Sequence, residues 1–187
     1  MKSFAPLMAA WALATATLAA QAERIVDFKD ARQVARWSAY SDQVIPGGAS
    51  VAHFERREEG GQGLLHLSGE LKPGFIYPYA GVQLALGEGS KARDWSAYRG
   101  LRFKARGDGK VYRVNVVLSK VKDHDEHGYY FKTGMQWQTV EVPFTELKQS
   151  GFGRRIAWDP RQVTHLGFQA GGGVMAYGLD IHDVELY

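Results

Sequence analysis

Residues 112–118 read Tyr-Arg-Val-Asn-Val-Val-Leu, and their pattern indicates the class of fold. Every second residue in it is large and mostly apolar: Tyr112, Val114, Val116 and Leu118. Successive side chains of a β-strand point to opposite faces of a sheet. The alternation therefore predicts a strand with one face in a core and with Arg113, Asn115 and Val117 on the other face.

The same alternation recurs in residues 138–144, which read Gln-Thr-Val-Glu-Val-Pro-Phe. Thr139 and Glu141 are expected on the solvent side. Pro143 has no N–H to donate to a neighbouring strand, so it marks a strand end. The residues expected to face the core are Val140, Val142 and Phe144.

Outside these two stretches, short runs rich in Val, Leu, Phe and Tyr alternate with Gly, Pro, Asp and Asn at intervals of about 8 to 15 residues. This spacing predicts an all-β fold, an antiparallel β-sandwich. Residues 28–37 and 144–148 have helical patterns, and the turn Gly107-Asp108-Gly109 predicts a tight hairpin. The expected strands are residues 50–54, 63–69, 79–86, 100–106, 112–119, 129–132, 138–143, 165–169 and 177–187.

The N-terminal segment has the organisation of a secretion signal. Lys2 is followed by an uncharged run over residues 4–20, and the run ends at Ala20-Gln21-Ala22. We therefore expect residues 1–22 to be a signal peptide cleaved after Ala22, with residues 23–187 as one domain in the periplasm or secreted. Stable membrane insertion is not expected after cleavage, although an uncleaved anchor is the alternative that such a run leaves open.

Composition narrows the functional classes. The chain has no Cys, so no disulfide can form. Its formal net charge is +3, and basic and acidic residues are interleaved, so no basic patch predicts nucleic-acid binding. The pairs Arg56-Arg57 and Arg154-Arg155 are isolated and are expected to be solvated loop charges.

Several motifs occur in a fixed order along the chain: residues 42–50 (Asp-Gln-Val-Ile-Pro-Gly-Gly-Ala-Ser), Gly69, Gly74-Phe75, 94–101, 106–112, 137–144 and 179–184. Together they resemble the complex I intermediate-associated protein 30 (CIA30) family. The resemblance implies a galactose-binding-like jelly roll. It also implies a non-catalytic module that binds a protein partner in an assembly or chaperone-like role.

Two segments look more like carbohydrate-binding modules of the same jelly-roll class. They are residues 75–82, and Trp158-Asp159-Pro160 together with the closing strand. This likeness implies the alternative function, which is binding of a polysaccharide or a cell-envelope glycan.

No pattern in the sequence indicates catalysis or a cofactor. A Gly-x-Ser-x-Gly elbow, a His-Glu-x-x-His motif and a phosphate-binding loop are all missing, so the chain is not expected to be an enzyme. Residues 123–128 (Asp-His-Asp-Glu-His-Gly) predict a solvated acidic turn, with a divalent-metal site as the alternative. The aspartates Asp27, Asp30, Asp180 and Asp183 are expected to cap turns and strand ends, with a structural calcium as the alternative.

Aromatic side chains outside the expected core are the best candidates for a binding site. Flat rings stack on sugar faces and also anchor protein partners. We expect a concave sheet face that carries Arg113, Asn115 and neighbouring Tyr and Trp side chains, whereas Trp37 and Trp95 are expected in the core. The aromatic candidates are Tyr77, Tyr79, Tyr129, Trp137 and Trp158.

Overall fold

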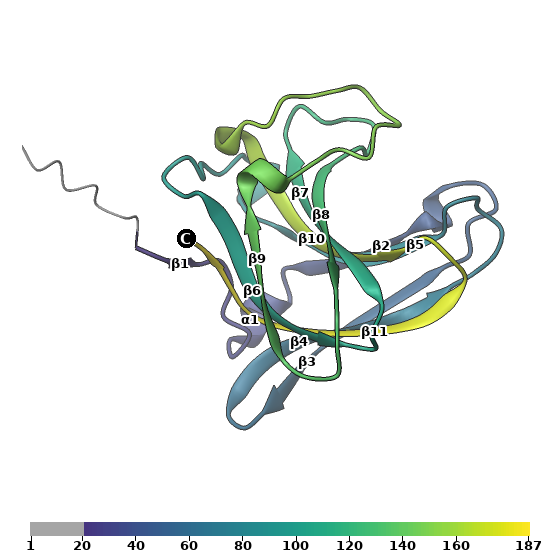
Figure 1. Ribbon diagram of the computed structural model, residues 1–187, viewed down its shortest axis with the longest axis horizontal. Helices are drawn as coiled ribbons and strands as arrows, with labels where there is room; N and C mark the ends of the chain where they lie inside the picture. Colours follow the sequence, from purple (N-terminus) through teal and green to yellow (C-terminus); the bar gives the residue numbers. More distant parts are fainter. Residues whose placement is uncertain (1–20) are drawn as a thin grey trace, which may run out of the picture.

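The computed structural model describes residues 21–187, which form two antiparallel β-sheets packed on each other (Figure 1). The predicted all-β sandwich is thus confirmed. Apart from its last two residues, the predicted signal peptide 1–22 lies outside the described residues. Within residues 21–187, no helix has the length and apolar character needed to cross a membrane.

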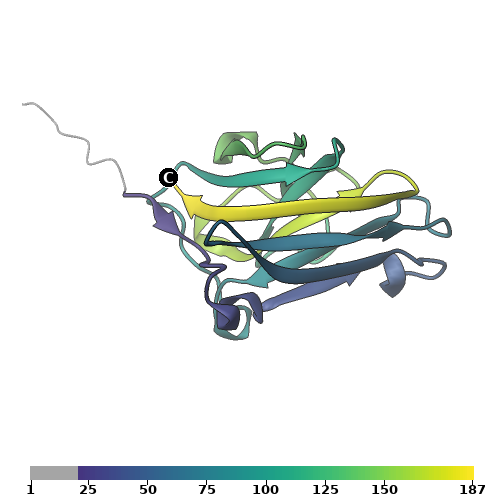
Figure 2. The same ribbon diagram turned by 90° about the horizontal axis from the view of Figure 1, so that it is seen from below.

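Each sheet draws its strands from distant parts of the chain. The six-stranded sheet has the order β3 (Val51–Glu59), β4 (Gln62–Leu71), β11 (Met175–Leu186), β6 (Gly100–Gly107) and β9 (Gln138–Pro143), and β1 (Glu23–Arg24) pairs with β11. In Figure 2, β11 is the yellow strand between β4 and β6. The five-stranded sheet has the order β2 (Trp37–Ser41), β5 (Tyr79–Ala85), β10 (Val163–Gly171), β7 (Val111–Leu118) and β8 (His127–Lys132).

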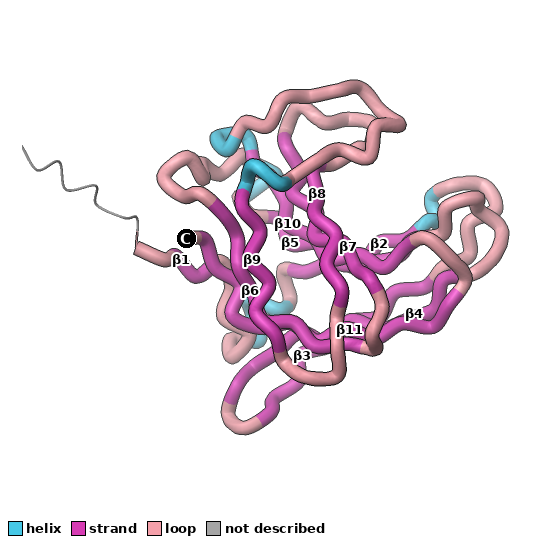
Figure 3. The backbone as a smooth tube through the Cα atoms, in the orientation of Figure 1, coloured by secondary structure: helices cyan, strands magenta, loops and turns pink. Residues whose placement is uncertain are grey.

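Helical segments are short (Figure 3). They are α1 (Ala31–Val34) and the 3-10 turns η1 (Asp42–Val44), η2 (Glu88–Ser90), η3 (Phe144–Glu146) and η4 (Pro160–Gln162). The prediction of a helix over residues 28–37 is wrong in extent, because Trp37 opens β2 and pairs with Leu84 of β5. Burial of Trp37 between the sheets outweighs the local helical pattern. The helical pattern of residues 144–148 is likewise reduced to η3.

The turn at Gly107-Asp108-Gly109 exists but is not a hairpin, so that prediction is wrong. It joins β6 in one sheet to β7 in the other. Gly109 has a φ of +83°, which L side chains rarely adopt. The Asp108 carboxylate accepts from the Tyr112 hydroxyl at 2.9 Å and from the Gly178 N–H at 3.2 Å. The turn therefore fastens the two sheets together at this point.

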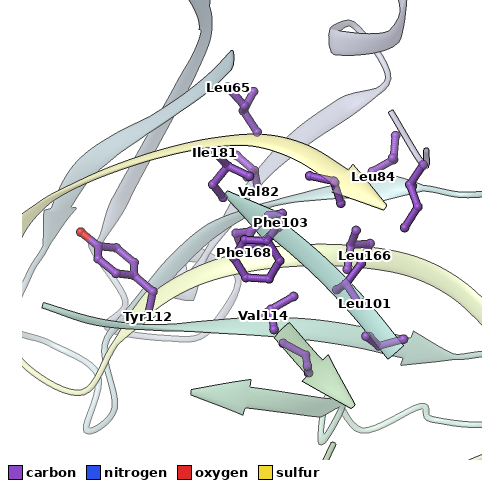
Figure 4. Close-up of a cluster of buried hydrophobic side chains, with 14 of the residues drawn as sticks. Leu65, Val82, Leu84, Leu101, Phe103, Tyr112, Val114, Leu166, Phe168 and Ile181 are labelled. Carbon is purple, nitrogen blue, oxygen red and sulfur yellow. The ribbon is translucent and has the colours of Figure 1, made fainter. Parts of the chain in front are cut away.

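The core between the sheets follows the predicted alternation (Figure 4). The core-facing residues predicted from 112–118 and 138–144 are all buried, as are Trp37 and Trp95. The rings of Phe103 and Phe168 meet edge to face from opposite sheets, with centroids 5.0 Å apart. Each such buried side chain contributes about 1.5–3 kcal/mol to stability. This packing fixes which residues of each strand turn outward.

Candidate ligand-binding face

The outer face of the five-stranded sheet presents two rows of side chains that cross all five strands. Strand register aligns Tyr40, Gly81, Gln169, Arg113 and Tyr130 in one row. The next row holds Ser38, Gln83, Gly167, Asn115 and Gly128. Arg113 is the single charged residue in these two rows, and three of the ten positions are glycine.

Two of the glycines make room for larger neighbours. A Cβ on Gly81 would lie 2.9 Å from the Tyr40 hydroxyl oxygen, and a Cβ on Gly128 would lie 2.5 Å from the Arg113 Nε. The Tyr40 ring and the Arg113 guanidinium therefore lie against the backbone of the neighbouring strands. Any side chain at these glycines would push them off the sheet.

Tyr40, Gln169 and Asn115 form a hydrogen-bonded network on this face. The Tyr40 hydroxyl donates to Gln169 Oε1 at 3.1 Å. Asn115 Nδ2 donates to the same oxygen at 3.0 Å and to the Tyr40 hydroxyl at 3.3 Å. Burial raises the pKa of Tyr40 above its ordinary value, so its hydroxyl keeps its proton. The three side chains are thus fixed before any ligand binds.

Arg113 is buried beside this network, with 6% of its surface exposed. Its Nη2 donates to the carbonyl oxygens of Glu126 at 2.9 Å and Lys148 at 3.0 Å. Its Cζ lies 5.5 Å from the ring centroid of Tyr130, which is 64% exposed. Burial also raises the pKa of the Glu126 carboxyl. The face therefore combines an exposed aromatic ring with fixed hydrogen-bonding groups.

A buried carboxylate organises the loops at one end of these strands. Asp42 is 0% exposed and accepts from the Ser50 N–H at 2.9 Å, the Ser50 hydroxyl at 2.6 Å and the Tyr79 N–H at 3.2 Å. Gly47, at a φ of +88°, packs on the Gly74 backbone. The motif of residues 42–50 is therefore a clamp that joins two loops at the rim of the face.

The sequence placed only part of this site correctly. Arg113 and Asn115 do lie on the outer face, but both are buried. Tyr79 lies at the rim, 6.3 Å from Tyr40 between ring centroids, and Tyr77 is exposed in the preceding loop. Tyr129 pairs with Val114 and packs against the core, so its expected surface position is wrong.

Two tryptophans predicted for the same platform lie elsewhere. Trp137 contacts Arg106 and His182 on the outer face of the six-stranded sheet, with centroid distances of 4.5 Å to Arg106 Cζ and 4.3 Å to the His182 ring. Trp158 packs against Phe144 at the end of the sandwich, 5.2 Å between ring centroids. Sequence reasoning missed Tyr40, Gln169 and Tyr130. The apolar residues Phe131 and Phe168, which directly neighbour Tyr130 and Gln169, were the signal that the sequence offered for these two.

The segment 123–128 is the expected solvated turn only at Asp123 and His124, which are exposed, whereas Asp125, His127 and Gly128 are buried. Asp125 is 1% exposed and accepts from the N–H groups of Ser150 at 2.7 Å, Gly151 at 3.0 Å and Gly153 at 3.1 Å. Asp123 accepts from the Arg154 N–H at 2.6 Å. These carboxylates therefore fasten the loop after β7 to residues 148–154.

Each of the four aspartates considered for calcium lies beside a basic side chain. Asp30 caps α1 and pairs with Arg32. Asp180 lies 2.6 Å from His66 Nδ1. Asp27 and Asp183 lie 4.0 Å and 3.6 Å from Arg24. In the part of the chain that the structure describes, no three His, Cys, Asp or Glu side chains form a group that could hold a metal ion.

Fold and outer face together define a β-sandwich of the galactose-binding-like jelly-roll class with a candidate binding face on its five-stranded sheet. The solved structures similar to it include the family 11 carbohydrate-binding module of a cellulosomal cellulase of Clostridium thermocellum, with a TM-score of 0.70, 16% identity, and coverage of 89% of this chain and 94% of that one. A family 30 module from the same organism gives a TM-score of 0.55 at 19% identity, covering 76% of this chain and 91% of that one. These likenesses show the fold.

Residues 26–181 match the family described as Complex I intermediate-associated protein 30 (CIA30), so this chain belongs to the CIA30 family. It is 31% identical to the mitochondrial Complex I intermediate-associated protein 30 of Drosophila melanogaster, over 87% of this chain and 62% of that protein. It is 28% identical to Endoglucanase 3 of Fibrobacter succinogenes, over 78% of this chain and 24% of that enzyme. The chain therefore spans less than two thirds of either relative.

Proposed function

We propose that this protein is an exported glycan-binding module, and that glycan binds on the outer face of the five-stranded sheet. The observation that carries the proposal is the fixed network of Tyr40, Gln169 and Asn115 beside the exposed ring of Tyr130. A sugar presents hydroxyls that both donate and accept, and apolar ring faces that stack on aromatic rings. Amides and tyrosines held on one face of the sheet match both features.

The composition of the face favours a glycan over a protein partner. The fully buried centre of a protein–protein interface is more apolar than the rest of the protein surface and is depleted of charged residues. Here the two central rows hold three amides, a serine and three glycines, beside two tyrosines and one arginine. One family 11 neighbour is described in complex with a β-1,3-1,4-mixed-linked tetrasaccharide, which adds support.

A protein partner is the second candidate ligand. The loops at one end of the five-stranded sheet favour it, because they expose apolar side chains. Val44, Ile76, Tyr77 and Val174 are exposed there. These loops are adjacent, because Asp42 contacts Tyr79 and the Gly172 N–H donates to the Pro78 carbonyl at 3.3 Å. Exposed apolar patches mark interaction sites. Relatives named for complex I intermediates fit an assembly role of this kind.

Export is part of the proposal, because it would bring the module to polysaccharides in the periplasm or outside the cell. It rests on the signal-like residues 1–22. Cell fractionation with mass measurement of the purified chain tests it. A mature protein beginning at Glu23 is the expected result, and an uncleaved cytoplasmic chain would contradict export.

Affinity electrophoresis tests the ligand class and the face together. The panel contains mixed-linkage β-1,3-1,4-glucan, agarose and peptidoglycan fragments, and the proteins are the wild type, Tyr130→Ala and Trp137→Ala. Both variants remove a ring beside an arginine, so they are matched. We expect Tyr130→Ala to weaken retention about tenfold, or about 1.4 kcal/mol, while Trp137→Ala leaves it unchanged.

Two outcomes would overturn this proposal. If no glycan in the panel retains the wild type, the glycan proposal is wrong and the protein partner becomes the preferred candidate. Loss of retention in Trp137→Ala, with Tyr130→Ala unaffected, would place the site on the other sheet.

A further inference from the structure

A groove of about 790 Å³ lies at one end of the sandwich, where β7 ends and β10 begins. Ser96, Lys120 and residues 155–161 line it. None of these residues belongs to the two rows on the outer face of the five-stranded sheet. The groove is therefore a separate feature, and a ligand bound in it would not depend on the glycan site proposed for that sheet.

The groove carries unbalanced positive charge. Asp159 is the one carboxylate in its lining, and its Oδ1 lies 3.0 Å from Arg161 Nε, so these two charges compensate each other. Lys120 and Arg155 also line the groove, and both are exposed. Within residues 21–187, neither of them has a carboxylate oxygen within 4.0 Å. The lining therefore carries two cations that form no ion pair in the described residues, of which Lys120 also lies within electrostatic range of Asp159.

The walls of the groove are held in place by packing and backbone hydrogen bonds. The half-buried ring of Trp158 lies 5.2 Å from Phe144 and 5.6 Å from His127, between ring centroids. The Trp95 N–H donates to the Pro160 carbonyl at 2.8 Å. Asp159 caps η4 by accepting from the Arg161 N–H at 3.1 Å. Because these groups are already fixed, ordering them on ligand binding would cost little free energy.

We propose that this groove is a second binding site, for an acidic saccharide that carries a carboxylate. The Lys120 ammonium and the Arg155 guanidinium bind the carboxylate, since charge-assisted hydrogen bonds to carboxylates are the strong ones. The ring of Trp158 in the wall provides an apolar surface for the sugar. A bare inorganic anion would use the two cations and leave Trp158 without a role.

Isothermal titration of the purified protein with hexagalacturonate tests the site, with neutral cellohexaose as the comparison ligand. The test variant is Lys120→Ala/Arg155→Ala. Its matched control is Lys122→Ala/Arg154→Ala, which removes the same charge from adjacent exposed positions outside the groove lining. All four side chains are exposed, so both double variants are expected to fold.

The groove variant should bind hexagalacturonate at least about tenfold more weakly than the wild type, while the control changes by less than about twofold. Added salt should weaken wild-type binding. Tyr130→Ala should leave it unchanged, which separates this site from the outer face. Failure of hexagalacturonate to bind, equal losses in both double variants, or equally tight binding of inorganic phosphate would each overturn the proposal.

Discussion

The outer faces of the two sheets differ in the polar side chains they carry: charged side chains in ion pairs on the six-stranded sheet, and mostly neutral side chains on the five-stranded sheet. On the six-stranded sheet, Arg106 binds both Glu59 and Asp180 at 2.8 Å, and Asp180 also binds His66 at 2.6 Å. On the five-stranded sheet, the central rows hold amides, tyrosines and glycines around one arginine. Ion pairs at a partly exposed surface contribute little to stability and need no ligand. The fixed neutral groups are those suited to recognising an uncharged ligand.

Each face also holds one aromatic ring near an arginine, and the surroundings differ. Arg106 lies 4.5 Å from the Trp137 ring centroid and has two carboxylate partners. Arg113 lies 5.5 Å from the Tyr130 ring centroid and donates only to carbonyl oxygens. An aromatic residue is therefore a guide to function only when its neighbours are considered with it. Three substitution experiments sharpen the contrast.

The largest effect is expected from the carboxylate at the rim of the five-stranded sheet. Asp42→Asn would replace one carboxylate oxygen by an amide N–H₂, which would face either the Ser50 N–H or the Tyr79 N–H, and both of these groups already donate. We expect a loss of about 2–4 kcal/mol in the free energy of unfolding. Asp180→Asn on the other face should cost about 1 kcal/mol, since Arg106 keeps Glu59. Urea denaturation measures both, and equal losses would contradict the contrast.

A second effect comes from two outward glycines. Gly128→Ala should cost about 1–3 kcal/mol, because the new Cβ would displace Arg113 from two carbonyl oxygens. Gly178→Ala on the six-stranded sheet should change stability by less than about 0.5 kcal/mol, since no atom lies within 4 Å of its Cβ position. Thermal unfolding of the two variants compares them. An unchanged stability in Gly128→Ala would show instead that the Arg113 side chain is free to move aside.

The fold was largely predictable from sequence, because alternation reports directly on burial. Residues 112–118 and 138–144 predicted the correct inward side chains and the strand end at Pro143. The site was not predictable to the same degree. Alternation cannot say which sheet a strand joins, so Trp137 and Arg113 were assigned to one face although β9 and β7 lie in different sheets. Tyr129 and Tyr130 differ by one position, and that single step reverses their faces.

The smallest effect is a pH dependence of stability at Glu126. Burial raises the pKa of its carboxyl above the ordinary 4.5, so the folded state holds the proton more tightly than the unfolded state does. The stability that this group contributes is therefore greatest at low pH, and it falls as pH rises from about 4.5 through the raised pKa. Glu126→Gln should remove this fall. Denaturation of both proteins across this range checks it, and a difference independent of pH would contradict it.

Amide chemical-shift mapping can locate a bound glycan on the outer face of the five-stranded sheet. The ligand is the glycan retained most strongly in affinity electrophoresis. We expect the largest shifts in β2, β5, β10, β7 and β8, around Tyr40, Gln169, Asn115 and Tyr130. Shifts concentrated around Trp137, Arg106 and Asp180, or no shifts with any glycan in the panel, would contradict this expectation.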